Sequence, residues 1–257
     1  MVDYASPLPL NLPEKIFHNR LPGWSIFIMN GNNDDLDTAA IPEDIWEAGG
    51  IYPLQATAQL LEIVSSSAAD AAAGLGARTV KITGLNALYE VITETLTLNG
   101  VTAVATVNAY LRINEFKVVT VGATGYNVGT VTLRLASAGV SQSVIGVATG
   151  LGDGVAHTGV YTVPLGLKAY PLMMTVSLLN EVPGSALVHL RVKEFNTSWF
   201  VRRQFGLNST GGSNVLFNPP FFTNPFPEKT DLKFTAVTST ANNMGISATL
   251  VGYLGPM

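Results

Sequence analysis

Hydrophobic side chains recur at every second position in several separate stretches, and this alternation limits the possible fold more than any other feature. Val188, Leu190 and Val192 alternate with polar or charged residues, and similar spacing recurs at 79–83, 92–98, 130–134, 232–236 and 246–250. Successive side chains of a strand point to opposite faces of a sheet, so each stretch predicts a strand with one buried face. Turn residues recur about every ten positions, which is typical of sandwiches. We predict an all-β fold: an antiparallel, jelly-roll-like β-sandwich with an extended N-terminal arm.

A tight turn is predicted at Asn99-Gly100. This dipeptide directly follows the alternating stretch 92–98, and Val101 begins another β-rich run. Asn-Gly favours a two-residue hairpin turn because its central residues need positive φ angles. We therefore expect the two runs to pair as a hairpin.

Residues 1–54 differ from the rest of the chain. Prolines are frequent there, at positions 7, 9, 13, 22, 42 and 53. Proline at this density disfavours helices and central strands, yet the segment is too apolar for a disordered tail. We predict an arm that docks on a neighbouring subunit or on its own domain; the alternative is an irregular lead-in packed against the chain's own sheet. The expected anchors of the arm are Trp24, Phe27, Ile45, Trp46 and Tyr52.

Residues 55–257 are predicted to form the β-sandwich domain. The region 136–154 is rich in Gly, Ser, Ala and Val and has few charges. It either separates two subdomains or forms one long loop. The stretch 208–227 is rich in Gly and Pro and contains Phe221, Phe222 and Phe226. Exposed aromatic residues are typical of contact surfaces, so these residues are interface candidates. The alternative is a loop that folds its aromatic rings back as a lid.

The composition favours permanent assembly. Charged residues make up only 12% of the chain and its mean hydropathy is +0.31. Such a chain tends to associate, because its apolar surface is exposed unless either a membrane or a stable assembly covers it. The most apolar stretch, 170–179, is half the length of a membrane-spanning helix and contains Pro171, and the N-terminus does not resemble a secretory signal. The net charge is −4 and the sequence has no block of basic residues, so it does not predict a positively charged surface that would bind nucleic acid.

Residues with catalytic or metal-binding potential are scattered. The chain has no cysteine, and His18, His157 and His189 lie far apart without the spacing of a zinc motif. We interpret the histidines as solvated or at the edge of the core. Asp34, Asp35 and Asp37 stand beside several asparagines, and such oxygens could bind Ca²⁺, although their order is not that of an EF-hand.

A solvated turn is the default interpretation of this acidic segment. Two glycine-rich segments, 74–78 and 150–154, resemble phosphate loops. The first leads into a strand, and neither is followed by a Walker lysine, so both are predicted to be turns. We expect no enzymatic activity, no catalytic residues, no cofactor and no metal.

Several short motifs are spread over most of the chain. They are N-N-D-D-L-D-T at 32–38, P-E-D-I-W at 42–46, G-G-I-Y-P at 49–53, S-S-S-A-A-D at 65–70, G-L-G-A-R-T-V at 74–80, Y-L-R-I-N at 110–114, N-V-G-T-V at 127–131, Y-T-V-P at 161–164 and E-K-T-D-L-K at 228–233. Together they resemble a family of virion structural proteins of tailed phages of the marine and cyanobacterial type. The sequence departs from the family pattern at Leu165 and Leu167.

The resemblance implies a capsid or tail component and supplies no catalytic residues. We predict a capsid decoration (cement) protein, homotrimeric, that clamps neighbouring subunits of the major capsid protein. It would be assembled in the host cytoplasm and lie on the outer capsid surface, with neither nucleic acid nor membrane as a partner. The alternative is a head-fibre, tail or adhesin component that binds a host surface glycan or protein.

Overall fold

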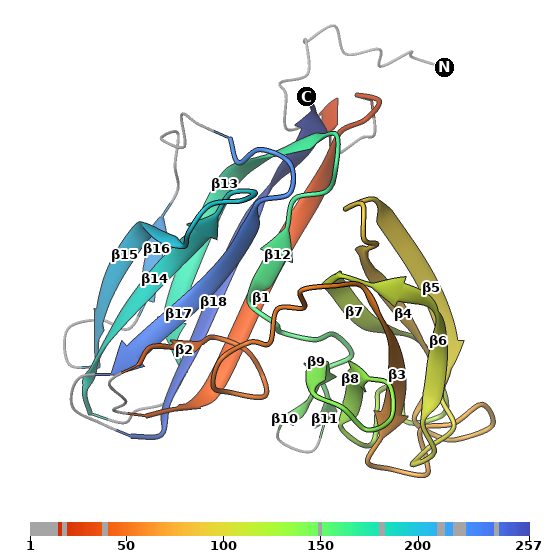
Figure 1. Cartoon of the computed structure of the whole chain (residues 1–257). Coiled ribbons are helices and arrows are strands. Elements are labelled where there is room, and N and C mark those ends of the chain that lie inside the picture. Colours follow the sequence, from red (N-terminus) through yellow and green to blue (C-terminus); the bar gives the residue numbers. More distant parts are fainter. Residues whose placement is uncertain are drawn as a thin grey trace, which may run out of the picture.

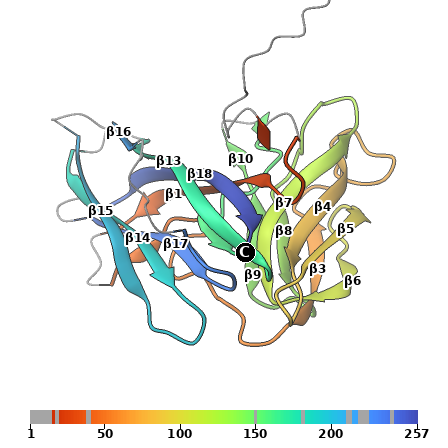
Figure 2. The same cartoon turned by 90° about the horizontal axis from the view of Figure 1, so that it is seen from above.

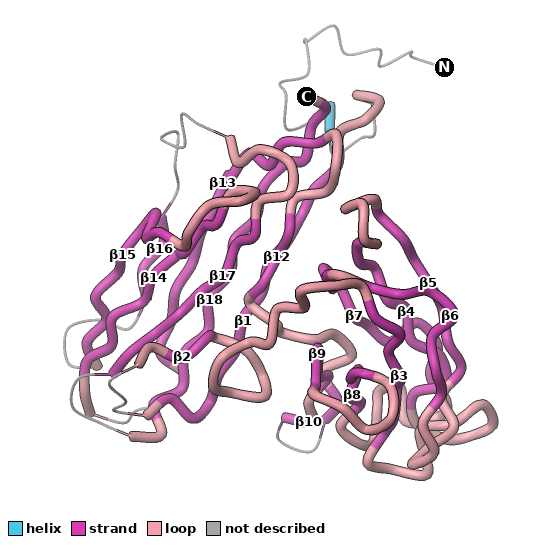
Figure 3. Tube along the Cα trace, viewed as in Figure 1, coloured by secondary structure: helices cyan, strands magenta, loops and turns pink. Residues whose placement is uncertain are grey.

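The computed structural model describes residues 15–16, 20–37, 41–148, 151–179, 183–209, 214–217, 225–238 and 242–257. Strands dominate this part of the chain, and helical backbone within it is confined to residues 15–16 (Figure 3). The predicted all-β class is confirmed, and all paired strands are antiparallel. No helix among the described residues is long and apolar enough to cross a membrane.

Two antiparallel β-sandwiches lie side by side (Figures 1 and 2). The strands of the first are β1 (Ser25–Leu36), β2 (Glu43–Asp44), β12 (Val160–Thr162), β13 (Leu167–Leu178), β14 (Ser185–Lys193), β15 (Phe200–Asn208), β16 (Asn214–Phe217), β17 (Asp231–Thr238) and β18 (Met244–Pro256). One layer, sheet A, has the order β1-β18-β13-β16. The other layer, sheet B, has the order β12-β17-β14-β15, with β2 paired to β17.

The second sandwich is built from a continuous part of the chain. Its strands are β3 (Gln59–Ser65), β4 (Ala77–Leu85), β5 (Val91–Thr97), β6 (Val104–Tyr110), β7 (Arg112–Val121), β8 (Val131–Leu135) and β9 (Ser141–Ile145). Sheet C has the order β6-β3-β8-β9, and sheet D has the order β5-β4-β7. Two short strands, β10 (Val147–Ala148) and β11 (Leu151–Gly152), pair with each other just after it.

The second sandwich is inserted between β2 and β12 of the first. The chain enters it at β3, leaves it after β9, and returns through a crossover formed by residues 146–159. The predicted seam at 136–154 overlaps this crossover, and the described residues divide into two subdomains there. Residue 54, expected to separate an arm from a single sandwich domain at 55–257, lies in the connection from β2 to β3, and β1 and β2 on its N-terminal side are strands of the first sandwich.

Each sandwich encloses its own hydrophobic core. The first core includes Met29, Leu36, Leu190, Phe234 and Leu250, and the second includes Ile63, Ile82, Tyr110, Phe116 and Leu133. The alternation in the sequence explains which side chains are inside: in β14, Val188, Leu190 and Val192 are completely buried. Burying each such side chain stabilises the fold by about 1.5–3 kcal/mol.

The N-terminal region docks on the chain's own sheet where it is described. Residues 25–36 form β1, which pairs with β18 from Ser25 opposite Leu254 to Leu36 opposite Met244. Of the docking arrangements that the sequence left open, the structure therefore has the intramolecular one for this segment. Residues 1–14 lie outside the described residues.

A tight turn forms at Asn99-Gly100, closed by a bridge between Asn99 and Thr102, but the flanking strands do not pair as the predicted hairpin. The strand before the turn, β5, pairs with β4 in sheet D, and the strand after it, β6, pairs with β3 in sheet C. The turn therefore crosses from one layer of the sandwich to the other. Gly100 has the positive φ that the dipeptide favours, but its N–H donates to Asp70 O and its carbonyl accepts from Ser65 N. These bonds to another loop hold the turn between the two sheets.

Candidate functional site

The face of sheet A that points away from the first core carries exposed apolar side chains. In β1, Phe27 is buried, whereas Ile26 and Ile28 point outward and are 44% and 53% exposed. Residues opposite each other on paired strands share a face. The register therefore defines an outer strip of two rows: Ile26, Tyr253 and Tyr170, then Ile28, Val251 and Met173.

The outer strip continues into a face without charge. The next two rows are Asn30, Thr249 and Thr175, then Asn32, Ser247 and Ser177. None of the four rows contains Asp, Glu, Lys or Arg. At the other end the ring of Trp24 lies 5.3 Å from that of Tyr170 and extends the strip. Depletion of charge with enrichment of aromatic residues is characteristic of the centre of protein interfaces, so this face is the candidate assembly surface.

Strand β1 also forms an edge of sheet A. Gly31 is bridged to Thr158, and the N–H of Gly159 donates to Asn30 O, so the crossover covers the middle of β1. Among the described residues, no strand pairs with the outer edge of 25–29. An open strand edge next to an apolar face allows backbone pairing with another chain as well as side-chain packing.

Four of the five predicted arm anchors are buried within this chain. Phe27 and Ile45 belong to the first core, and Trp46 packs edge-to-face against Tyr52 with ring centroids 5.1 Å apart. They are buried because residues 25–52 supply β1, β2 and the loop that follows them. The prediction that these four side chains contact a partner is therefore corrected. Trp24 alone remains partly exposed, beside the outer strip.

The predicted aromatic contact loop is described only at its end. Phe226 is buried in the first core, and its backbone pairs with that of Ala169. Its expected role as a contact residue is corrected to that of a ring folded back into the core. Phe221 and Phe222 lie outside the described residues.

Residues from three of the sequence motifs meet at the junction between the sandwiches. Arg112 of β7 forms two parallel bonds with Asp231 of β17: Nε to Oδ1 at 2.8 Å and Nη2 to Oδ2 at 3.0 Å. Arg112 Nη1 also donates to Gln55 O at 2.7 Å, and Thr162 Oγ1 donates to Asp231 Oδ1 at 2.6 Å. Burial alone would lower the pKa of Arg112, but Asp231 outweighs it and the pKa is raised. Arg112 and Asp231 therefore join the two sandwiches through a buried bidentate contact.

A second buried pair links β2 to β17. Lys233 Nζ lies 2.8 Å from Asp44 Oδ1, and Asp44 Oδ2 accepts a 2.7 Å hydrogen bond from Tyr52 N. Burial raises the pKa of Asp44 even though Lys233 opposes the shift. The Lys233 ammonium also lies 5.0 Å from the ring centre of Trp199. These contacts hold the segment around β2 on sheet B.

Asp70 organises the turns of the second sandwich. Its Oδ1 accepts hydrogen bonds from Ala77 N at 2.8 Å and Val128 N at 2.9 Å. Its Oδ2 accepts from Ser65 Oγ at 2.6 Å and Gly129 N at 2.8 Å. Asp70 is completely buried, so this carboxylate connects three of the sequence motifs by hydrogen bonds alone.

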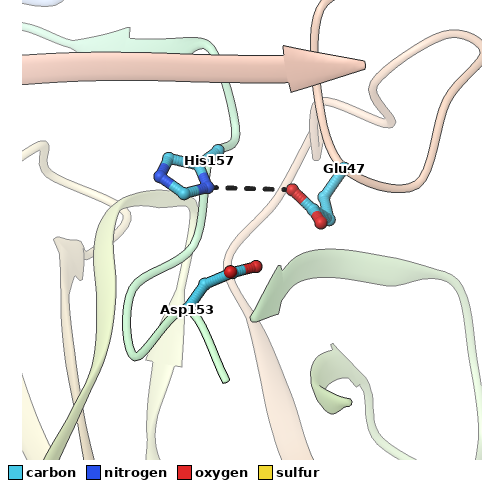
Figure 4. Close-up of side chains that lie close together, drawn as sticks. All are labelled: Glu47, Asp153 and His157. Carbon is cyan, nitrogen blue, oxygen red and sulfur yellow. Dashed lines mark ion pairs between the residues drawn. The ribbon is translucent and has the colours of Figure 1, made fainter. Parts of the chain in front are cut away.

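Three titratable side chains converge beside the crossover (Figure 4). Glu47 follows β2, whereas Asp153 and His157 belong to the crossover, and their ligand-type atoms lie within 4.8 Å of one another. Glu47 Oε2 is 3.8 Å from His157 Nδ1, and Glu47 raises the pKa of His157 above its ordinary value. Sequence reasoning placed His157 in a solvated or core-edge position and missed its two acidic neighbours, because no local spacing connects them.

The acidic segment after Asn33 lines a neighbouring hollow. Asp34, Asp35, Asp37 and Glu43 all border it. The Glu43 carboxylate already accepts hydrogen bonds from Gly50 N at 2.9 Å and Asn33 Nδ2 at 3.4 Å. The sequence had left Ca²⁺ as an alternative here, and among the described residues these four do not form a group with metal-ligand spacing.

A small cavity of about 180 Å³ opens between the sandwiches next to Arg112. The rings of Tyr89 and Phe195 meet edge-to-face, 5.8 Å apart, and Lys229 lies 5.0 Å from the Phe195 ring centre. Three residues that line it, Tyr89, Asn196 and Lys229, have positive φ angles between 60° and 66°. Non-glycine residues held in this conformation cost about 1–3 kcal/mol each and cluster at binding sites.

Comparison with known proteins adds little to this description. No family model and no curated protein matches the chain. Among solved structures, the VP2 subviral particle of infectious bursal disease virus aligns with 12% identity over 96% of this chain and 74% of that chain, at a TM-score of 0.21. The structure of the Gt strain of the same virus aligns with 13% identity over 96% and 78%, at a TM-score of 0.19. TM-scores this low do not establish a common fold.

Proposed function

We propose that the protein is a structural component of a phage particle, specifically a capsid decoration protein that clamps neighbouring capsid subunits. The observation that carries this proposal is the outer face of sheet A, whose four central rows lack charged residues and include a strip of isoleucine, valine, methionine and tyrosine side chains. Contiguous exposed apolar patches on soluble proteins mark sites of interaction with other proteins.

The sequence supports the same role in two ways. The motifs at 42–46, 110–114 and 228–233 resemble those of phage virion proteins, and in this fold they build buried connections between and within the sandwiches. The low charge content of 12% suits a chain that lies in an assembly. We therefore propose a non-enzymatic protein without cofactor that works through contact area.

The proposed partners are a second copy of the chain and the major capsid protein. A stable contact buries about 800 Å² on each partner, more than the two rows of the outer strip supply. The polar rows at Asn30 and Asn32 and the open edge of β1 would enlarge the contact. We propose a homotrimer on the outer capsid surface, assembled in the host cytoplasm.

The test uses charge placed on the outer strip. The double variant Ile28→Lys/Val251→Lys should lose trimer formation, capsid binding or both by at least about 30-fold, the equivalent of about 2 kcal/mol. Val107→Lys is the matched control, because Val107 is 85% exposed on β6 of the other sandwich. Light scattering measures the trimer, and co-sedimentation with capsids lacking this protein measures binding. Wild-type behaviour of the double variant in both assays would exclude the outer strip as the contact surface.

The cavity at Tyr89 favours a second candidate function, an adhesin role in a head fibre or tail. Aromatic rings beside charged side chains suit a small polar ligand such as a host surface glycan, with the rings against its apolar face. Phe195→Ala should then abolish binding on a glycan array while leaving capsid binding intact. If the wild-type protein binds no glycan on the array, the adhesin function is excluded.

A further inference from the structure

The cluster of Glu47, Asp153 and His157 brings two carboxylates close together. All three donor groups fall within 4.8 Å of one another, and each side chain is only partly exposed. Two carboxylates at this separation repel each other when both are ionised, and a cation between them would relieve this repulsion. A protonated His157 supplies one positive charge against two negative ones. A divalent cation would neutralise the two negative charges of the Glu47 and Asp153 carboxylates.

Two features of the site are consistent with a bound ion: an unpartnered carboxylate oxygen and a glycine that lets the two carboxylates approach each other. Glu47 Oε2 is buried and makes no hydrogen bond, although a buried carboxylate oxygen normally has a partner. Gly146 lies directly against the two carboxylates, and a Cβ atom at this position would collide with Glu47 Oε1 and lie 2.7 Å from Asp153 Oδ2. Only a residue without a side chain lets the carboxylates approach each other here.

We propose that Glu47, Asp153 and His157 bind a divalent transition-metal ion of the Zn²⁺ class. This inference goes beyond the proposed role in assembly. One imidazole nitrogen with two carboxylate oxygens is a donor set that suits Zn²⁺ better than Ca²⁺ or Mg²⁺, which prefer oxygen ligands alone.

The separation of Glu47 and His157 is close to that of two ligands of one bound ion. Two tetrahedral ligands at about 2.1 Å from Zn²⁺ lie about 3.4 Å apart. The separation of Glu47 Oε2 and His157 Nδ1 is 3.8 Å, so a small side-chain movement would close the site. Water would supply the fourth ligand, because His157 and Glu47 retain 31% and 17% side-chain exposure.

The ion would connect two segments that are distant in the sequence. Glu47 lies just after β2 on the first sandwich, and the other two ligands lie on the crossover that returns from the second (Figure 4). Zn²⁺ would therefore fix the crossover against the β2 region. The bound form should resist heat and proteolysis at residues 146–159 better than the metal-free form.

The experiment is calorimetric titration of Zn²⁺ into EDTA-treated full-length protein, with a parallel thermal melt. One ion should bind per chain, and the melting temperature should rise in a saturable way. Glu47→Gln and His157→Gln should each weaken binding at least about tenfold. Gly146→Ala should also weaken it while the fold is retained, because side-chain ends can move away from the new methyl group.

Asp35→Asn is the matched control, since Asp35 is an exposed carboxylate on the neighbouring hollow that does not belong to the cluster. This variant should bind Zn²⁺ like the wild-type protein. Circular dichroism confirms that each variant is folded. Absence of Zn²⁺ binding at millimolar concentration, unchanged binding in the Glu47 and His157 variants, or stronger binding of Ca²⁺ than of Zn²⁺ would overturn the proposal.

Discussion

Removal of the Arg112 guanidinium is expected to destabilise the protein by about 4 kcal/mol. In Arg112→Met the carboxylate of Asp231 stays buried and keeps the hydrogen bond from Thr162 Oγ1, while Gln55 O loses a donor. The side chains of the pair are only 8% and 5% exposed, so water cannot replace the lost contact. Breaking a buried pair from one side costs about 3–5 kcal/mol. Coulomb's law gives a similar value, about 4 kcal/mol for charges about 4 Å apart at an effective dielectric constant of about 20.

Urea unfolding followed by circular dichroism measures this loss. A change of about 4 kcal/mol lowers the urea midpoint by about 1.3 M at an m-value of about 3 kcal/mol/M. The double variant Arg112→Met/Asp231→Leu removes both charges, and we expect it to recover at least half of the loss. A cost below about 1 kcal/mol for Arg112→Met, or a double variant as unstable as the two single changes added together, would refute this reasoning.

Three further changes test other parts of the fold. Burial raises the pKa of Glu62, but hydrogen bonds from Arg134 and two loop amides outweigh it and the pKa is lowered. The stability that this carboxylate adds is present above its unfolded pKa of about 4.5 and lost as the pH falls through the lower folded value. The difference in melting temperature between wild type and Glu62→Gln should therefore shrink from pH 6 to pH 3. A difference that does not change with pH would contradict the assignment. Gly252→Ala places a methyl group 2.5 Å from a core ring and from a backbone oxygen, and should cost about 1–3 kcal/mol in urea unfolding, whereas Gly206→Ala, with open space around it, should be nearly neutral. Asp70→Asn replaces one acceptor oxygen by a donor that faces N–H groups, and should lower the free energy of unfolding by about 3 kcal/mol; a loss under about 1 kcal/mol would show that the turns do not depend on the carboxylate.

Local patterns predicted the strands and their buried faces well. Alternation at 188–193 identified the buried side of β14, because strand geometry forces successive residues to opposite faces. The same reasoning failed at Asn99-Gly100. Gly100 has the expected positive φ and Asn99 does not, and a local preference for a turn does not specify which sheet the next strand joins.

The aromatic residues of the predicted arm show a second limit of prediction from one sequence. Trp46 and Tyr52 are apolar enough for either a core or an interface, and one sequence does not distinguish these environments. Their burial on this chain's own sheet B depends on β2 reaching β17, nearly two hundred residues later in the sequence. The outer strip was missed for the related reason that its members come from three strands, and each contributes only two residues.

The sequence by itself determined the all-β class, the strand faces and the low charge content that favours assembly, since these follow from local alternation and composition. The tertiary structure alone decided that two sandwiches form, that the N-terminal segment completes the first of them, and that Glu47 meets Asp153 and His157. These outcomes depend on which distant segments pair. Pairing is set by the summed burial and hydrogen bonding of the whole fold, and no short stretch of sequence contains that sum.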